Sequence, residues 1–199
     1  MTPRRYGDAG QAFPIYITVV AGLLFLAFAY LAVGQAAANR NGAQTAADAA
    51  ALAAAQDTRD KLAGQWLKVV RDPTKWQDIL DGNVAHLDGC WRAYQLAGQN
   101  DSRVLDEHCD PQLLDLSYTV EVETNKPVGD SIVPGTESRH AKASAKAVIE
   151  PLCQPPGGDV RGNPLPKLTC KDNRNWDPNP DDPASLPGPE DLFDVHLAD

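Results

Sequence analysis

Apolar and polar residues are distributed unevenly along the chain, and each part of the pattern predicts a different element. The first long apolar stretch runs from Phe13 to Gly34 and contains no charged residue. At about 1.5 Å per residue, a helix of this length can cross a bilayer core of about 30 Å. We therefore predict a transmembrane helix over residues 12–38, preceded by a short cytoplasmic N-terminus of residues 1–11.

The flanking charges predict the orientation of this helix. Arg4 and Arg5 precede the apolar run, whereas Arg40 is the nearest positive charge after it. By the positive-inside rule, this pattern favours a single-pass protein of the cytoplasmic membrane with its N-terminus inside and its C-terminal domain extracytoplasmic. A cleaved signal peptide is the alternative, because residues 36–38 are alanines that could form a cleavage site. The apolar run is, however, longer than the usual h-region of about 7–15 residues.

An alanine-rich stretch, NGAQTAADAAALAAAQD, follows from Asn41 to Asp57. Thr45 and Asp48 have the spacing of a capping box, which would mark a new helix start. If the first helix instead continues through Gly42, Asp48 lies in the middle of a helix. We favour one long helix with a weak point at Gly42, continuing as an extracytoplasmic Ala-rich stem over residues 39–71.

Downstream periodicities predict a small α+β domain over residues 72–150. A helical stripe of Leu62, Trp66, Val69 and Val70 ends before Asp72-Pro73, and a short helix with Trp76, Ile79 and Leu80 follows. Two stretches alternate between apolar and polar residues, 114–124 and 139–150, and predict an antiparallel hairpin. A lone hairpin is marginal in water, so we expect the Leu62–Val70 stripe to cover it.

The last part, residues 151–199, is rich in proline and acidic residues, which predicts a disordered tail with a disulfide loop. Its residues 191–195 would either fray or anchor on a partner. The predicted fold class is therefore α+β. A transmembrane helix continues into an Ala-rich stem and packs on a small antiparallel β hairpin or sheet, and a disordered Pro-rich acidic tail follows.

Four cysteines, Cys90, Cys109, Cys153 and Cys170, lie in the segment predicted to be exported. An even count in an oxidising compartment predicts two disulfides, for which three connectivities are possible. Short loops favour Cys90–Cys109 with Cys153–Cys170. The alternative is a metal site formed by His86, Cys90, His108 and Cys109, but these residues lack the tight ligand spacing of zinc signatures.

Charge and motifs narrow the classes of function. The net charge is -9, which argues against nucleic-acid binding. Glu121 and Glu123 share a predicted strand face, where Lys142 or Lys146 could pair with them across the hairpin. The sequence contains none of the common nucleotide-binding, hydrolase or metalloprotease motifs, so we predict a non-enzymatic protein without cofactor, bound metal or small-molecule substrate.

The order of a glycine-containing start, GDAGQAF, an apolar span, Arg40, Gln44 and AADAAALAAA (residues 46–55) is more specific than alanine richness. Over about residues 5–57 it resembles the Tad/Flp pilus-assembly family of the TadE/TadG-like type. The resemblance implies a membrane-anchored, minor-pilin-like component of a pilus or related secretion apparatus, with a pilin-like plan of helix and sheet.

The resemblance also implies partners, namely other pilus-assembly proteins or pilins that contact the transmembrane and stem helix. Small residues near one face, Gly22, Ala29 and Ala36, together with Asp48, are the predicted helix-packing residues. The chain departs from prepilin-peptidase substrates, because cutting after Gly10 or Gly7 puts Ile15 or Ala12 where those substrates carry glutamate. The alternative function is a solitary membrane-anchored cell-surface module that recognises a wall component or partner protein.

Overall fold

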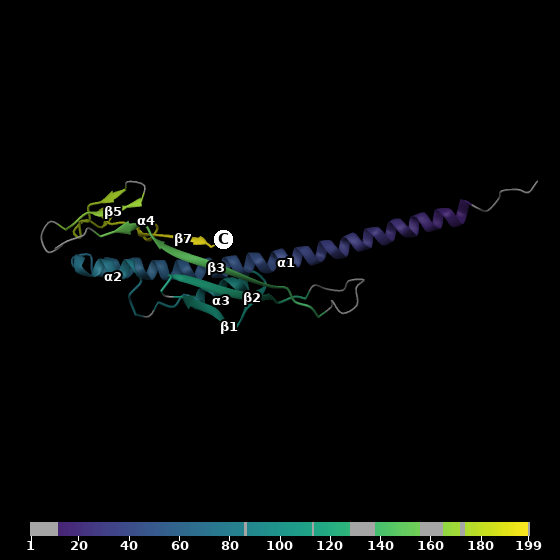
Figure 1. The fold of residues 1–199 in the computed structure, drawn as a ribbon, viewed down its shortest axis with the longest axis horizontal. Coiled ribbons are helices and arrows are strands. Elements are labelled where there is room, and N and C mark those ends of the chain that lie inside the picture. The colour runs from purple at the N-terminus through teal and green to yellow at the C-terminus, as the bar shows by residue number, and fades with distance from the viewer. Residues whose placement is uncertain are drawn as a thin grey trace, which may run out of the picture.

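One helix dominates the structure. The computed structural model describes residues 12–85, 87–112, 114–127, 138–155, 165–171 and 174–198. Its helix α1 (Ala12–Lys68) has 57 residues and is about 86 Å long at 1.5 Å per residue. The first part of α1 projects away from the rest of the protein, and the second part lies along a sheet (Figure 1). The predicted N-terminus, residues 1–11, lies outside the described residues.

Helix α1 continues through Gly42 without interruption, so no second helix begins at Thr45. The Thr45 hydroxyl donates to the carbonyl oxygen of Asn41, one turn earlier, over 3.0 Å. Asp48 accepts a hydrogen bond of 2.8 Å from the side-chain amide of Gln44. The capping-box alternative is therefore wrong, and Asp48 lies mid-helix with a polar partner on the same helix.

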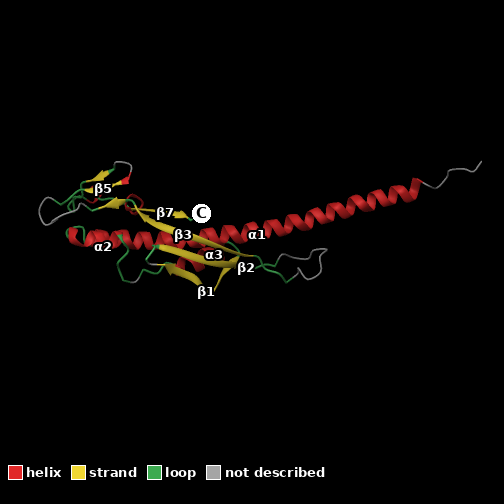
Figure 2. Ribbon diagram, in the orientation of Figure 1, coloured by secondary structure: helices red, strands yellow, loops and turns green. Residues whose placement is uncertain are grey.

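The remaining chain forms an antiparallel sheet of four strands in the order β1-β2-β3-β7. The strands are β1 (Ser102–Gln112), β2 (Ser117–Thr124), β3 (Lys142–Pro151) and β7 (Phe193–Leu197). In the β2–β3 hairpin Tyr118 lies opposite Ala147, and Glu123 lies opposite Lys142. The hairpin and the α+β fold class, with a long helix packed on an antiparallel sheet, are confirmed (Figure 2).

Shorter elements complete the body. They are η1 (Pro73–Lys75), α2 (Trp76–Leu80), α3 (Cys90–Gln99), β4 (Cys153–Gln154), β5 (Leu168–Cys170), β6 (Asn175–Trp176), η3 (Pro183–Ser185) and α4 (Pro189–Leu192). Strands β4, β5 and β6 form a separate small sheet. Helix α3 packs against α1 and β1, so two helices cover one face of the main sheet. The buried Trp66 and Trp76, whose ring centroids are 5.3 Å apart, join the end of α1 to α2.

The alanines of α1 form much of its buried face. They are 8% exposed or less at positions 43, 46, 47, 50, 51, 53, 54 and 55. The sequence predicts that these alanines contact neighbouring helices and that the Leu62–Val70 stripe covers the hairpin. The stripe does pack on the hairpin, since Leu62, Trp66 and Val70 are buried in one cluster with residues of β2 and β3. The alanines, however, are buried within the protein's own body, in the same cluster as the β3 residues Ala145 and Ala147. A methyl side chain allows the helix axis to approach the sheet closely, which explains why alanine occupies this face.

Helix α3 begins in direct contact with the backbone of α1. A Cβ atom added to Gly89 would lie 2.1 Å from the carbonyl oxygen of Ala54, so only glycine fits there. The Gly89 N–H donates to the Tyr118 hydroxyl over 3.1 Å. The same hydroxyl shares a buried hydrogen bond of 2.7 Å with the hydroxyl of Thr58. Tyr118 therefore joins α1, β2 and the start of α3.

We expect the replacement Tyr118→Phe to lower the free energy of unfolding by about 1 kcal/mol. The ring would still fill its place in the core, but Gly89 and Thr58 would lose a buried partner. Chemical denaturation of the full chain in detergent, followed by tryptophan fluorescence, measures this change. The control Tyr94→Phe alters a half-exposed tyrosine on α3 and should leave the midpoint unchanged. Equal midpoints for Tyr118→Phe and wild type would contradict the role of this hydroxyl.

The described residues of the predicted tail include short strands and helices that pack on the body. Strand β7 pairs with β3, with Ile149 opposite Val195. Leu192 and Phe193 are fully buried. The prediction that residues 191–195 fray or anchor on a partner is wrong, because their apolar side chains complete the protein's own core. Residues 156–164 of the predicted tail lie outside the described residues.

Candidate membrane-anchoring site

The first part of α1 exposes large apolar side chains all around the helix. Tyr30 is 83% exposed, Phe13 71% and Phe25 66%. Burying such side chains is worth about 1.5–3 kcal/mol each, so a helix exposing so many of them is unfavourable in water. The helix is long and apolar enough to cross a membrane, and no residue of its most apolar 18-residue window is buried among the described residues. A bilayer supplies the missing apolar surroundings.

The predicted packing residues Gly22, Ala29 and Ala36 lie on this exposed part of α1. They are seven residues apart, so they remain near one face of the helix. A Cβ atom added to Gly22 would have no neighbour within 4 Å among the described residues. Asp48, the fourth predicted packing residue, lies farther along α1, beside the sheet. A role of these residues in contacts between helices stays a prediction.

The folded body begins directly after the apolar segment. The side-chain amide of Asn39 donates to the carbonyl oxygen of Pro127, at the end of the β2–β3 hairpin, over 3.2 Å. One turn later Gln44, which is bonded to Asp48, also reaches the carbonyl oxygen of Ser144 on β3 at 3.5 Å. The predicted stem is therefore part of the folded body and does not separate the body from the apolar segment, since the body covers α1 from about Asn39 onward.

Two disulfides hold the outer parts of the body, Cys90–Cys109 and Cys153–Cys170. They are the two local pairs that the short loops favour. The first ties the start of α3 to β1, and the second ties β4 to β5. Cysteines bonded to each other cannot supply thiolate ligands, so the alternative metal set loses two of its members. His86, another member, lies outside the described residues.

The outer face of the main sheet carries charged side chains. Glu123 forms an ion pair with Arg103 on β1 and lies opposite Lys142 on β3. Nε2 of His108 lies 3.6 Å from a carboxylate oxygen of Glu121. Opposite charges on neighbouring strands stabilise a sheet modestly. The sequence predicts Lys142 or Lys146 as the partners of these glutamates. Glu123 does lie opposite Lys142, but its ion pair is with Arg103, and Glu121 lies opposite Ser144.

A long helix with an exposed apolar first part beside an α+β body is consistent with the class of single-span membrane-anchored proteins. The family model described as "Putative Flp pilus-assembly TadE/G-like" matches residues 10–57. The match covers the apolar segment and the whole alanine-rich stretch, and it confirms the predicted resemblance for this segment. No curated protein and no solved structure matches the chain significantly.

Proposed function

We propose that this protein is a non-enzymatic, membrane-anchored component of a Tad-type (Flp) pilus or a related secretion apparatus, of minor-pilin-like character. The observation that carries the proposal is the family match over residues 10–57. The structure adds two supports: the exposed apolar part of α1 suits insertion into a bilayer, and the body beside it is held by disulfides. Disulfides persist in oxidising compartments, which supports a body outside the cytoplasm and an N-terminus inside.

The contacts with partner proteins are assigned to the exposed part of α1. The alanines of residues 46–55 are largely buried in the body, so they leave little surface for a neighbouring helix. Gly22, Ala29 and Ala36 lie on helix surface that the described body leaves open. In lipid, small residues let two helices approach closely, and packing rather than exclusion of water then drives their association.

Larger side chains on the helix face with Gly22, Ala29 and Ala36 should weaken association with the partner proteins. We expect the double variant Ala29→Leu with Ala36→Leu to reduce co-purification of other pilus-assembly proteins on the order of tenfold, because packing between helices in lipid is worth about 1–2 kcal/mol. The measurement is quantitative mass spectrometry of proteins that co-purify with the full chain in mild detergent. The matched control, Ala27→Leu with Ala38→Leu, adds the same side chains near the opposite face.

Two outcomes would contradict the proposal. Equal co-purification for both double variants would show that the helix face with Gly22, Ala29 and Ala36 does not bind the partner proteins. A protein that is monomeric in mild detergent, with normal pilus assembly after deletion of its gene, would favour the alternative of a solitary surface-binding module.

A further inference from the structure

We propose that the end of the body nearest the apolar segment binds the headgroups of anionic phospholipids in the leaflet that it faces. This surface, the basic rim, consists of Arg40, Lys126, Arg139 and Lys142. The inference rests on the proposed membrane anchoring, and it adds a second contact with the bilayer. The body would then be held at the membrane surface by charge as well as by the helix that crosses the bilayer.

The distance of the basic rim from the hydrocarbon core follows from the length of α1 between the apolar run and the body. The apolar run ends at Gly34, and Asn39, which is bonded to Pro127, follows five residues later. Five residues of helix span about 8 Å. The headgroup layer on each side of the hydrocarbon core is about 5–8 Å thick. The hairpin end that contains Pro127 therefore lies at the outer limit of the headgroups.

Backbone contacts bring the ends of three strands to this level. The N–H of Thr124, the last residue of β2, donates to the carbonyl oxygen of Ala141 over 2.9 Å. A ring nitrogen of His140 lies 2.7 Å from the carbonyl oxygen of Thr124. The N–H of Asn125 donates to the carbonyl oxygen of Asp101, just before β1. Figure 1 shows this end of β2 and β3 directed along α1 toward its apolar part.

The charges at this end differ from those of the chain as a whole. Arg40, Arg139 and Lys142 are exposed, and the Lys126 side chain is 80% exposed. Two described acids lie at this end. The carboxylate of Asp101 is 3.8 Å from the Lys126 ammonium group, and Glu123, which lies opposite Lys142, is ion-paired with Arg103. Residues 128–137, outside the described residues, add Asp130 and Glu137 in sequence.

The far end of the body is acidic. Its described acids include Asp72, Asp78, Asp81, Asp115, Asp181 and Asp182. Two of these acids are ion-paired, Asp72 with Lys75 and Asp181 with Arg71. The chain as a whole carries a net charge of -9, so a cluster of exposed cations beside the span is a marked asymmetry. An anionic leaflet attracts the basic rim, whereas the far end lies several Debye lengths away and is screened from the leaflet by salt. Attraction at one end alone favours one orientation of the body on the membrane.

The proposed ligand is a phospholipid headgroup whose phosphodiester gives it a net negative charge, as in phosphatidylglycerol. Arginine donates in a fork that matches phosphate oxygens, and lysine acts as a point charge. Each cation near an anionic surface adds attraction that salt weakens, because the Debye length is about 8 Å at physiological ionic strength. Zwitterionic phosphatidylcholine lacks the net charge and should bind the basic rim much more weakly.

The test uses the full chain in detergent, with phosphatidylglycerol or phosphatidylcholine added and bound lipid counted by native mass spectrometry. The rim variant carries Arg40→Gln, Arg139→Gln and Lys142→Gln. The matched control carries Lys68→Gln, Lys75→Gln and Lys167→Gln, which remove the same charge from exposed lysines at the far end. We expect phosphatidylglycerol affinity to fall about fivefold for each rim cation removed and to stay unchanged in the control.

Each outcome separates the inference from the proposed function. The proposed lipid binding by the basic rim would be refuted if the wild type bound both lipids equally. It would also be refuted if the two variants lost equal phosphatidylglycerol affinity. An acidic partner protein in place of lipid would show as rim-dependent co-purification from cells together with equal binding of both lipids. Extraction of the wild-type chain from membranes by alkaline carbonate would instead refute the anchoring itself. A chain that resists extraction but shows no preference for phosphatidylglycerol would refute this inference alone.

Discussion

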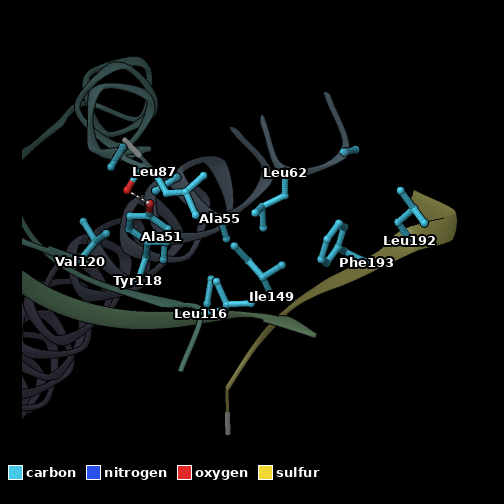
Figure 3. Packing of buried hydrophobic residues seen from close by; sticks show 14 of the residues in the cluster. Ala51, Ala55, Leu62, Leu87, Leu116, Tyr118, Val120, Ile149, Leu192 and Phe193 are labelled. Atoms are coloured by element: carbon cyan, nitrogen blue, oxygen red, sulfur yellow. Dashed lines mark hydrogen bonds between the residues drawn. The ribbon is translucent and has the colours of Figure 1, made fainter. Parts of the chain in front are cut away.

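Replacing Phe193 by alanine is expected to lower the free energy of unfolding of the body by about 3–5 kcal/mol. Phe193 is the first residue of β7 and is fully buried. It points into the core beside Leu192, with Leu62 and Ile149 in the same part of the cluster (Figure 3). Its removal leaves a cavity between α1 and the sheet that the rigid helix cannot collapse to fill.

The change can be measured by chemical denaturation of the full chain in detergent. The buried indoles of Trp66 and Trp76 report the unfolding of the body by fluorescence. Val195→Ala, a truncation of a half-buried side chain on the same strand, is the matched control and should cost much less. If the two variants had equal midpoints, Phe193 would not anchor β7 in the core.

A leucine at position 51 should destabilise the body by about 1–3 kcal/mol through overpacking. Ala51 is fully buried on α1 and lies beside Tyr118 in Figure 3. The extra atoms have no space between helix and sheet, so α1 must move away from β2. That movement would also stretch the bond between the hydroxyls of Thr58 and Tyr118.

Ala49→Leu provides the comparison for this prediction, since Ala49 is only half-buried on the same helix. Surface substitutions of this kind change stability by about 0.5 kcal/mol or less. Hydrogen exchange would add a local readout, with faster exchange of β2 amides in the Ala51→Leu protein only. Two equally stable variants would show that the alanine face does not need small side chains.

The sequence predicts the elements whose pattern is regular and local. The apolar run of α1 and the alternation in β2 and β3 are such patterns. Strand β1 is different, because a shift of register between Val104 and Cys109 interrupts its alternation. Strand β7 does alternate, with Phe193, Val195 and Leu197 apolar, but the surrounding prolines favour a disordered interpretation.

The site shows the same division between local and distant signals. The exposed apolar segment and the alanine motif can be recognised from consecutive residues. The junction with the body depends on Asn39 and Pro127, which are 88 residues apart. Likewise, nothing near Gly89 in the sequence indicates that it must lie against Ala54. Such contacts follow from the tertiary fold, so local patterns cannot reveal them.

Strand β7 follows the other strands of the main sheet in sequence, which sets an order of events during synthesis. Helix α1 precedes β3 and β7 follows it, so the edge of β3 that pairs with β7 stays open until residues 193–197 have been made. The Cys153–Cys170 bridge spans a separation of 17 residues, and its oxidation shortens the connection that β7 must close. The main sheet is therefore completed late, after β7 has been made, and the Cys153–Cys170 bridge favours that step.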